Sequence, residues 1–461
     1  MIDREREREW LTTQLSQADR QLLVIYGRRR VGKTTLVTTV LDTLDCDSVY
    51  YLCDQRGSAH NATAFAARCA EQFDDIPPAV DGFVEAFQYL TNRVNGRCVV
   101  ALDEFSYLVA ADETVPSVFQ TIVDEVLAGT EISLVLLGSS ISLMEDGVLS
   151  YESPLYGRRT GQWKLDPLSF SSMRAFVPQV TIESQIQMYS VLGGVPAYLE
   201  QFDPTESLFE NIEQTILSKG AFLYEEPEFV LRQELREPAT YMSILEAIAD
   251  GATRVSEIAN EIGKNASSLS RYLKNLSELA IVHQEHPVTD PDSRGVYQLA
   301  DDFLRFWFRY VAPNRNTLEQ GHTRPVCETI RETLPTHTSR TFETVCRQAV
   351  SSSSFPVSCA RVGRWWYDTQ EIDIVGVDPQ TTTLLVGECK WTTDSVGREL
   401  LTELESTAGN VRWQGSDRTV EYALFAREGF NSELRQHAED RDNLYLYDLA
   451  ALNDLFDGGS T

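Results

Sequence analysis

The sequence lacks any long apolar run. No stretch reaches the roughly 18 uninterrupted apolar residues that a membrane-spanning helix needs. The N-terminal stretch MIDREREREW is strongly charged, and no apolar segment of the signal-peptide type follows it. We therefore expect a cytoplasmic protein without a membrane partner.

The sequence also lacks paired cysteines. Its eight cysteines form no C-x-x-C motif, and none stands at zinc-binding spacing from the six histidines. A disulfide framework is not expected in a cytoplasmic chain. We therefore expect free, buried thiols.

Lysine is scarce, and acidic residues are abundant. Of the 40 basic residues only six are lysines, whereas 69 residues are acidic and the formal net charge is −29. The six are Lys33, Lys164, Lys219, Lys264, Lys274 and Lys390. A negative net charge normally argues against nucleic acid as a partner, so the local charge of each segment has to be considered separately.

With 461 residues the chain is too long for one core, and its length predicts about three domains.

A glycine-rich loop follows the first short apolar run. Residues 21–26 (QLLVIY) are typical of a buried parallel strand, and residues 36–44 of a helix. The loop between them reads G-x-x-x-x-G-K-T, which lets backbone amides face a phosphate while the lysine reaches the β- and γ-phosphates and the threonine binds Mg²⁺. A glycine loop without a ligand is the alternative, which the flanking elements disfavour. The expected ATP-binding residues are Gly27, Arg28, Arg29, Arg30, Val31, Gly32, Lys33, Thr34 and Thr35.

Polar residues end two further buried runs. Residues 97–104 (RCVVALDE) end in Asp103, expected to hold Mg²⁺ with Thr34, and in Glu104, expected to polarise the attacking water. An exposed acidic turn is the alternative, which the four preceding apolar residues disfavour. Residues 132–137 lead to Ser139, a candidate sensor of the γ-phosphate, for which a simple serine turn is the other interpretation.

Together these motifs resemble the archaeal ATPase family, which belongs to the AAA-like, signal-transducing STAND branch of P-loop proteins. The resemblance implies ATP and Mg²⁺ as cofactors, slow switch-like hydrolysis, and a γ-phosphate-sensing arginine at Arg158 or Arg159, for which solvated surface charge is the alternative. The acidic, lysine-poor composition resembles that of proteins from salt-loving archaea, so the total charge carries no argument against DNA. The matching segments are YGRRRVGKT (26–34), LDEF (102–105), GSS (138–140), SPLYGRRT (153–160), VLGGVPAYL (191–199) and DFLRFWF (302–308).

A winged-helix pattern follows a predicted helical lid. Its three helices are expected at 241–249, 255–263 and 266–276, and its wing strands at 281–282 and 296–299. The third helix of such a module enters the major groove of DNA. Between residues 254 and 280 there are four basic and three acidic residues, which makes only a small basic patch. A packing role is therefore the alternative. The candidate DNA contacts are Ser267, Ser268, Ser270, Arg271 and Lys274.

The C-terminal part contains a predicted β-hairpin with charged residues. A turn centred between Gln380 and Thr381 pairs residues whose numbers sum to 761, which places Asp373 opposite Glu388. Glu388 and Lys390 then share one face of the sheet. Facing carboxylates repel each other unless a cation joins them.

This D…E-x-K pattern, with Glu343 on a preceding helix, resembles the PD-(D/E)xK nuclease superfamily. The resemblance implies that Glu343, Asp373 and Glu388 form a Mg²⁺ site and that Lys390 orients or activates the water. The alternative is a cross-strand salt bridge between Lys390 and Glu371 in an inactive fold. Trp365 and Trp366 are interpreted as core or rim aromatics.

The sequence thus predicts an α/β protein with a P-loop parallel sheet and helical lid, then a winged helix and a C-terminal α/β restriction-endonuclease-like domain. The expected partners are ATP and DNA, and a homo-oligomer is left open. Two functions stay open: an ATP-controlled switch that acts on DNA, and a STAND-type signalling or scaffold ATPase with an inactive C-terminal domain. The expected divisions are a P-loop ATPase core (1–165), lid (166–236), winged helix (237–300), connecting helices (301–335) and nuclease-like domain (336–461).

Overall fold

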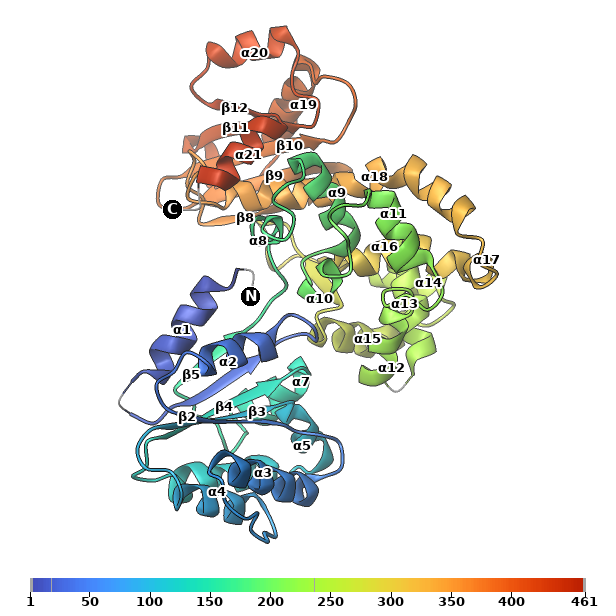
Figure 1. Ribbon diagram of the computed structural model, residues 1–461. Helices are drawn as coiled ribbons and strands as arrows, with labels where there is room; N and C mark the ends of the chain where they lie inside the picture. Colours follow the sequence, from blue (N-terminus) through green and yellow to red (C-terminus); the bar gives the residue numbers. More distant parts are fainter. Residues whose placement is uncertain (1–2, 18, 236, 459–461) are drawn as a thin grey trace. The chain divides into compact units, whose positions relative to one another are not determined.

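A computed structural model describes residues 3–17, 19–235 and 237–458 of the chain. The chain forms two compact units, Met1–Pro167 and Leu168–Thr461 (Figure 1). The predicted domains also include residues 1–2, 18, 236 and 459–461, which lie outside the described residues. All eight cysteines are free thiols. In the described part of the chain, every helix is too short or too polar to span a lipid bilayer.

The first unit contains a sheet of five parallel strands in the order β2-β3-β4-β1-β5. The strands β1, β3 and β4 are buried along their whole length, as expected for apolar strands covered on both faces. The three strands predicted from the sequence are these three, and they are confirmed to within one residue at each end. The strands are β1 (Leu22–Tyr26), β2 (Asp47–Leu52), β3 (Cys98–Asp103), β4 (Ile132–Gly138) and β5 (Gly161–Lys164).

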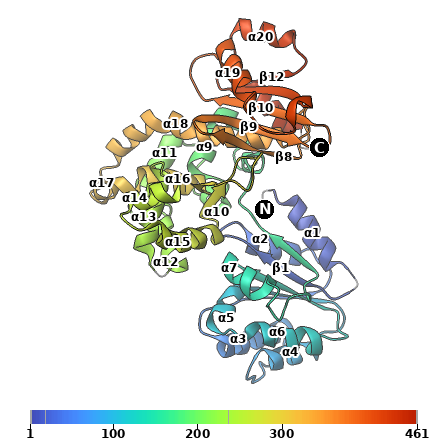
Figure 2. The ribbon, with the colours of Figure 1, turned by 180° about the vertical axis from the view of Figure 1, so that it is seen from behind.

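Helices cover both faces of this sheet. Figure 1 shows α1 and α2 on one side and α3 to α5 on the other, and Figure 2 shows α6 beside α4 from behind. On the α3–α4 side, the buried rings of Phe65, Phe83, Phe87 and Phe119 pack against one another. The helical elements are α1 (Glu5–Leu15), α2 (Lys33–Leu41), α3 (Ser58–Gln72), α4 (Phe83–Thr91), α5 (Phe105–Ala111), α6 (Val115–Thr121), η1 (Ile122–Val126), α7 (Ile141–Met144) and η2 (Glu145–Leu149).

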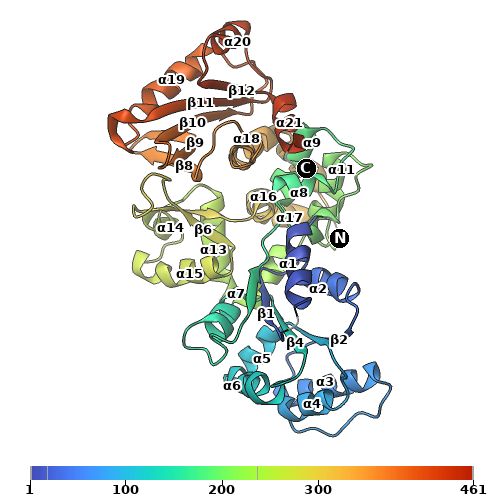
Figure 3. The ribbon, with the colours of Figure 1, turned by 90° about the vertical axis from the view of Figure 1, so that its left-hand side faces the viewer.

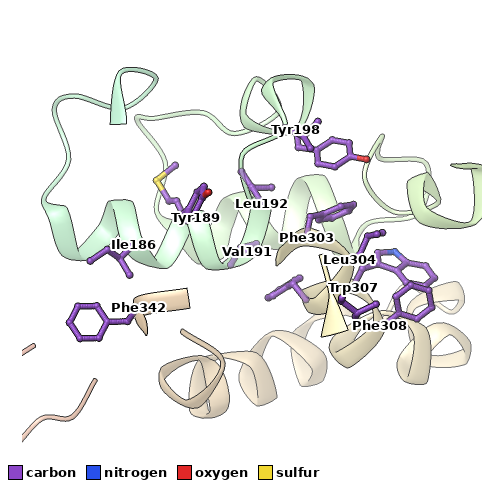
Figure 4. Close-up of a cluster of buried hydrophobic side chains, with 14 of the residues drawn as sticks. Ile186, Tyr189, Val191, Leu192, Tyr198, Phe303, Leu304, Trp307, Phe308 and Phe342 are labelled. Atoms are coloured by element: carbon purple, nitrogen blue, oxygen red, sulfur yellow. The ribbon is translucent and has the colours of Figure 1, made fainter. Parts of the chain in front are cut away.

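The second unit begins with helices that share one large apolar core. Figure 4 shows side chains of α9, α10 and α16 meeting in it, among them Leu192, Tyr198 and Trp307. The Trp307 indole N–H donates to the Tyr224 carbonyl at 2.9 Å, so this buried donor is satisfied. The elements are α8 (Phe170–Arg174), α9 (Ile182–Leu192), α10 (Pro196–Leu199), α11 (Leu208–Ile212), η3 (Glu213–Leu217), α12 (Glu226–Glu234), α16 (Asp302–Tyr310), η4 (Ala312–Asn314), α17 (Arg315–Glu319) and α18 (Thr323–Val350).

The predicted winged helix is present in this unit. Its third helix, α15, buries Leu269, Leu273 and Leu276 at helical spacing and leaves its serines and basic residues exposed. The two wing strands pair antiparallel, with Val282 opposite Leu299. The elements are α13 (Pro238–Ala249), α14 (Val255–Glu261), α15 (Ala266–Glu278), β6 (Val282–Glu285) and β7 (Val296–Leu299).

A second five-stranded sheet, ordered β12-β11-β10-β9-β8, forms the C-terminal part. The strands β8, β9 and β10 are antiparallel neighbours, whereas β10, β11 and β12 are parallel. The predicted hairpin register is confirmed, since Thr383 pairs with Asp378 and Gly387 with Ile374. The elements are β8 (Arg361–Tyr367), β9 (Gln370–Asp378), β10 (Thr383–Lys390), α19 (Arg398–Ala408), η5 (Gly415–Asp417), β11 (Thr419–Ala426), α20 (Ser432–Glu439), β12 (Leu444–Tyr447) and α21 (Leu449–Gly458).

The long helix α18 ties the helical core to this sheet. Its residues Phe342, Val345 and Cys346 are buried in the same apolar cluster as Ile374 and Phe425 of the strands. The boundary expected at residues 335/336 falls inside this continuous helix. The five-part division of the chain otherwise stays a prediction.

A buried histidine on α18 predicts acid sensitivity of the fold. Burial first, and then the cations of Arg305, Arg309 and Arg340, hold the pKa of His337 well below its usual value of about 6.5. The folded protein therefore keeps this ring neutral, whereas the unfolded chain protonates it below about pH 6.5. We expect the free energy of unfolding to fall by up to roughly 1.4 kcal/mol per pH unit below that value because of this group.

Denaturant titrations between neutral and acidic pH measure this effect. The exposed His322 provides the matched control, because His322→Gln should leave the pH slope unchanged. An NMR titration of the histidine rings provides a second readout that needs no variant. A His337 ring that titrates near pH 6.5 in the folded protein would contradict the prediction.

Candidate functional site

The loop between β1 and α2 is shaped for a phosphate group. A Cβ atom on Gly27, where φ is 151°, would lie 2.2 Å from the Leu165 carbonyl oxygen, so only glycine fits. Gly32, with a φ of 95°, is the N-cap residue of α2. The helix expected at 36–44 therefore starts three residues earlier, at Lys33, and ends at Leu41. The amides of residues 27–34 thus lie at the positive end of the helix dipole.

Lys33 lies inside this loop. Its side chain is buried, and Nζ donates to the carbonyl oxygens of Gly27 at 2.8 Å and Arg28 at 2.9 Å. The backbone of the loop therefore curves around the ammonium group. An anion bound in the loop would offer it stronger, charge-assisted acceptors than these neutral carbonyls.

The other arginines of the loop lie around it. Arg28 is buried, and Arg29 donates from Nη2 to the Tyr107 hydroxyl at 2.5 Å. Arg30 has a φ of 68°, Val31 is buried, and Thr35 is exposed on the first turn of α2.

Arg4 supports the phosphate loop, a role that the sequence did not indicate. Arg4, which precedes α1, donates from Nη2 to the carbonyl oxygens of Val31 at 3.2 Å and Asp166 at 2.6 Å. It also pairs with Glu7 at 2.9 Å. Arg4 therefore fixes the loop to the end of the segment that follows β5. In the sequence it is one of several arginines in a charged stretch, and no spacing distinguishes it.

Asp103 and Thr34 meet at the carboxyl edge of the sheet. The Thr34 hydroxyl donates to Asp103 Oδ2 at 2.5 Å, and the Asp103 carboxylate is buried at the end of β3. Tyr50 of β2 donates its hydroxyl to the same oxygen at 2.7 Å. Burial and this hydrogen bond raise the pKa of the Tyr50 phenol well above its usual value. Tyr50 was missed because its role depends on β2 lying next to β3.

Glu104 and Ser139 form a second pair at the same edge. The Ser139 hydroxyl donates to Glu104 Oε2 at 2.6 Å, and the Ser139 amide lies 3.4 Å from the same oxygen. Glu104 has a φ of 53°, a left-handed backbone that turns its side chain toward the end of β4. Five of the expected side chains (Lys33, Thr34, Asp103, Glu104 and Ser139) thus come together.

These residues fit a nucleotide with a divalent cation. A hydroxyl and one carboxylate, with phosphate oxygens and water, are the ligands that Mg²⁺ commonly takes in phosphoryl-transfer sites. The backbone amides and the lysine supply donors for the phosphates.

Arg158 and Arg159 lie at the opposite edge of the sheet. The Thr160 amide donates to the carbonyl of Leu22, the first residue of β1, whereas the phosphate loop follows its last residue, Tyr26. Those five residues span about 16 Å. Arg158 is held there by Asp124 at 2.7 Å, and Arg159 donates to the Leu149 carbonyl at 2.9 Å. Arg158 is thereby held away from the phosphate loop of its own chain, whereas the Arg159 guanidinium interacts electrostatically with Tyr26, the residue before the loop.

The C-terminal charged residues form a cluster in the second unit. Lys390 Nζ lies 3.0 Å from Glu388 Oε2, and Asp373 Oδ2 accepts the Cys389 amide at 3.0 Å. The alternative salt bridge between Lys390 and Glu371 is wrong, because Glu371 pairs with Arg364 instead. Glu343 faces the same region from α18 and lies 3.7 Å from Arg347.

The carboxylates of this cluster are crowded and poorly solvated. Burial and the nearby Asp373 carboxylate raise the pKa of Glu388 to about 7. The same two causes raise the pKa of Glu343, although Arg364 and Arg347 oppose them. Within the described ranges, no group of three or more His, Cys, Asp or Glu side chains is arranged to hold a metal ion. The cluster has the expected residues together, but a three-acid metal site is not formed.

Three segments of the chain match known protein families. Residues 1–202 match the family described as an ATPase domain predominantly from Archaea. Residues 242–284 match the bacterial regulatory proteins of the arsR family, and residues 307–404 match archaea bacterial proteins of unknown function. The first match confirms the resemblance to archaeal ATPases, and the second confirms a helix-turn-helix module where the winged helix was predicted.

Individual proteins are also similar to this chain. The solved Walker-type ATPase PABY2304 of Pyrococcus abyssi has a TM-score of 0.51 at 22% identity, covers 67% of this chain and 96% of its own, and shows a shared fold. The uncharacterized protein MJ0424 of Methanocaldococcus jannaschii is 43% identical over 60 residues, which is 13% of this chain and 58% of that protein.

The uncharacterized protein MJECL04 of the same organism is 33% identical over 396 residues, which is 85% of this chain and 87% of that protein. An archaeal P-loop ATPase domain therefore occupies the N-terminal part, and the chain belongs to the same protein family as MJECL04.

Proposed function

We propose that the chain is a Mg²⁺-dependent, ATP-controlled switch that acts on DNA. The observation that carries this proposal is the convergence of Lys33, the Thr34–Asp103 pair and the Glu104–Ser139 pair at one sheet edge. ATP binding and hydrolysis use such groups to hold phosphates, a metal ion and a water molecule.

The residues of the loop have separate tasks in this proposal. The amides of residues 27–34 and the Lys33 ammonium bind the β- and γ-phosphates, and Lys33 exchanges its two carbonyl acceptors for phosphate oxygens. Thr34 and Asp103 would hold Mg²⁺, which when bound neutralises phosphate charge.

The Glu104–Ser139 pair would report the state of the nucleotide. Glu104 orients the attacking water and accepts a proton from it once the Ser139 hydroxyl no longer donates to Glu104. This hydrogen bond is broken when the Ser139 hydroxyl turns to the γ-phosphate. The 2.6 Å hydrogen bond between the two side chains supports this coupling.

Arg158 would act on another copy of the chain. Because its ion pair with Asp124 holds it at the sheet edge away from its own phosphate loop, it could sense a γ-phosphate only in a neighbouring subunit, whereas Arg159 would serve its own site. The homo-oligomer left open by the sequence would then be the active form.

The winged helix supplies the DNA contact in this proposal. Arg271 and Lys274 lie on the exposed face of α15, and Lys274 lies 3.4 Å from Glu278. Phosphate contacts of this kind give a salt-dependent affinity.

The test compares nucleotide and DNA binding of the full chain. We expect labelled ATP to be retained with Mg²⁺ and lost with EDTA, and duplex DNA affinity to differ between ADP and a non-hydrolysable ATP analogue. The double variant Arg271→Ala/Lys274→Ala should weaken duplex binding about tenfold. The exposed pair Lys219→Ala/Arg324→Ala is the matched control. The proposal would be refuted if duplex affinity were the same with either nucleotide and the same for the native chain and the α15 variant.

A second candidate activity is cleavage of DNA by the C-terminal domain. The confirmed hairpin register, which places Asp373 toward Glu388 and Lys390, favours it. In this hypothesis Asp373, Glu388 and Glu343 would bind Mg²⁺ after the arginines beside Glu343 turn away, and Lys390 would orient the water. The mixed strand directions, antiparallel from β8 to β10 and parallel from β10 to β12, are compatible with a PD-(D/E)xK nuclease-like fold.

A plasmid-cleavage assay with ATP and Mg²⁺ tests this activity. We expect Asp373→Ala to lower the cleavage rate at least about 100-fold, because a metal ligand in the site is lost. The exposed Asp440 of the same domain provides the control Asp440→Ala. Cleavage that survives Asp373→Ala would refute the site. If the native chain does not cleave at any salt concentration, the STAND-type signalling ATPase with an inactive C-terminal domain becomes the better interpretation.

A further inference from the structure

The second unit contains a small cavity whose lining includes aromatic, basic and acidic side chains, with Asp290 and Asp368 beside the two arginines. Its volume is about 450 Å³, within the range of small-molecule pockets. The wing turn before β7 forms one wall, and the turn between β8 and β9 with the segment after α19 forms the other. The residues that matter are Arg294, Trp366, Tyr367, Asp368, Asn410 and Arg412.

The two walls are fixed to each other by main-chain and ionic contacts. The Val288 amide of the wing donates to the Arg364 carbonyl of β8 at 2.9 Å. The Arg364 guanidinium also pairs with Glu285 of β6 at 3.1 Å. Figure 3 shows the β6 region directly beside β8. The cavity is therefore a built feature of this unit.

The aromatic side chains of the cavity differ in how much of their surface is exposed. Trp365 is 5% exposed and belongs to the core, as the sequence suggested, whereas its neighbour Trp366 is half-buried at the cavity rim. Tyr367 is 61% exposed, although a phenol ring normally buries most of its surface. The Arg412 guanidinium lies 5.7 Å from the centre of the Tyr367 ring, a cation–π distance.

These groups match the chemistry of one unpaired DNA base. An exposed ring beside an arginine stacks on the π-face of a base, and exposed arginines bind its phosphate. Arg294 and Arg412 are both exposed, so they can reach a phosphate. The carboxylate of Asp368 can accept a hydrogen bond from a base amino group.

We propose that this cavity captures an unpaired base of single-stranded DNA, stacked on Tyr367 and clamped by Arg412. The inference rests on the proposed action on DNA, and it adds a site that prefers unpaired strands to the duplex contact of α15. A neighbouring cavity of about 490 Å³ shares Trp366 and Asp368 and reaches Glu343. A strand held at Tyr367 is thereby directed toward the carboxylate cluster.

The test measures the affinity of the full chain for a labelled single-stranded oligonucleotide and for the duplex of the same sequence. We expect Tyr367→Ala to weaken single-strand binding about tenfold, since a stacked base is lost. Duplex binding should change less than about twofold, because α15 carries it. Tyr367→Phe should bind like the native chain, and Tyr151→Ala, another exposed tyrosine, is the control.

The outcomes separate this site from the broader proposal. Unchanged single-strand affinity of Tyr367→Ala, with duplex binding intact, would overturn the base site alone. Equal losses in Tyr367→Phe and Tyr367→Ala would overturn it as well, because stacking does not need the hydroxyl. If the native chain binds neither form of DNA, the proposed function fails together with this inference.

Discussion

Substitution of Lys33 by alanine should abolish retention of ATP, with a loss of affinity of roughly 100-fold or more. The side chain is buried in the loop and donates two hydrogen bonds to it at 2.8 and 2.9 Å. The substitution therefore removes the cation that would neutralise the phosphates and the contacts that keep the loop curved. Equilibrium binding of labelled ATP in Mg²⁺ buffer at high KCl concentration measures the effect.

The matched control replaces a lysine that belongs to the second unit and not to the phosphate loop. Lys219 is exposed and pairs with Glu319, so Lys219→Ala should bind ATP like the native chain. If Lys33→Ala still retained the nucleotide at native affinity, the assignment of the loop would be wrong. A thermal unfolding curve of the variant distinguishes a lost ligand from a lost fold.

Substitution of Glu104 by glutamine should separate binding from hydrolysis. Glutamine keeps the size of the side chain and its contact with Ser139 but cannot accept a proton from water. We expect the hydrolysis rate to fall by roughly 10² to 10⁴, the range for loss of a general base, while ATP affinity stays close to that of the native chain. Phosphate release and equilibrium binding on the same preparation measure the two quantities.

Glu113 provides the control for this second prediction. It is exposed on the same unit, so Glu113→Gln should leave both quantities unchanged. Native hydrolysis by Glu104→Gln would assign the base to another residue. A joint loss of binding and hydrolysis would instead give Glu104 a structural role at the end of β3.

Local patterns were sufficient for much of the fold. The apolar runs at β1, β3 and β4 predicted the central strands, because a strand covered on both faces is apolar throughout. The two-residue period and the turn fixed the register of β9 against β10. The helix pattern of α13 to α15 with two short strands predicted the winged helix, since each depends on neighbours close in sequence.

Long-range contacts explain what the sequence did not reveal. Arg4 reaches Val31 and Asp166 only because α1 packs against the loop, and Tyr50 reaches Asp103 only because β2 is the neighbour of β3. Arg158 was expected near the phosphates from its motif, but strand direction places it at the other edge of the sheet. Neither strand order nor strand direction is encoded in a local motif.

The sequence by itself determined the phosphate loop, the acidic strand end and the charged hairpin, because each is a short-range pattern whose chemistry depends on residues a few positions apart. Only the tertiary structure decided which of these groups meet. In the structure Glu371 pairs with Arg364 rather than with Lys390. The Val288 amide of the wing donates to the Arg364 carbonyl of β8, the strand that ends at Tyr367. Such pairings depend on the packing of whole elements, in which burial of apolar surface fixes positions that no single residue specifies.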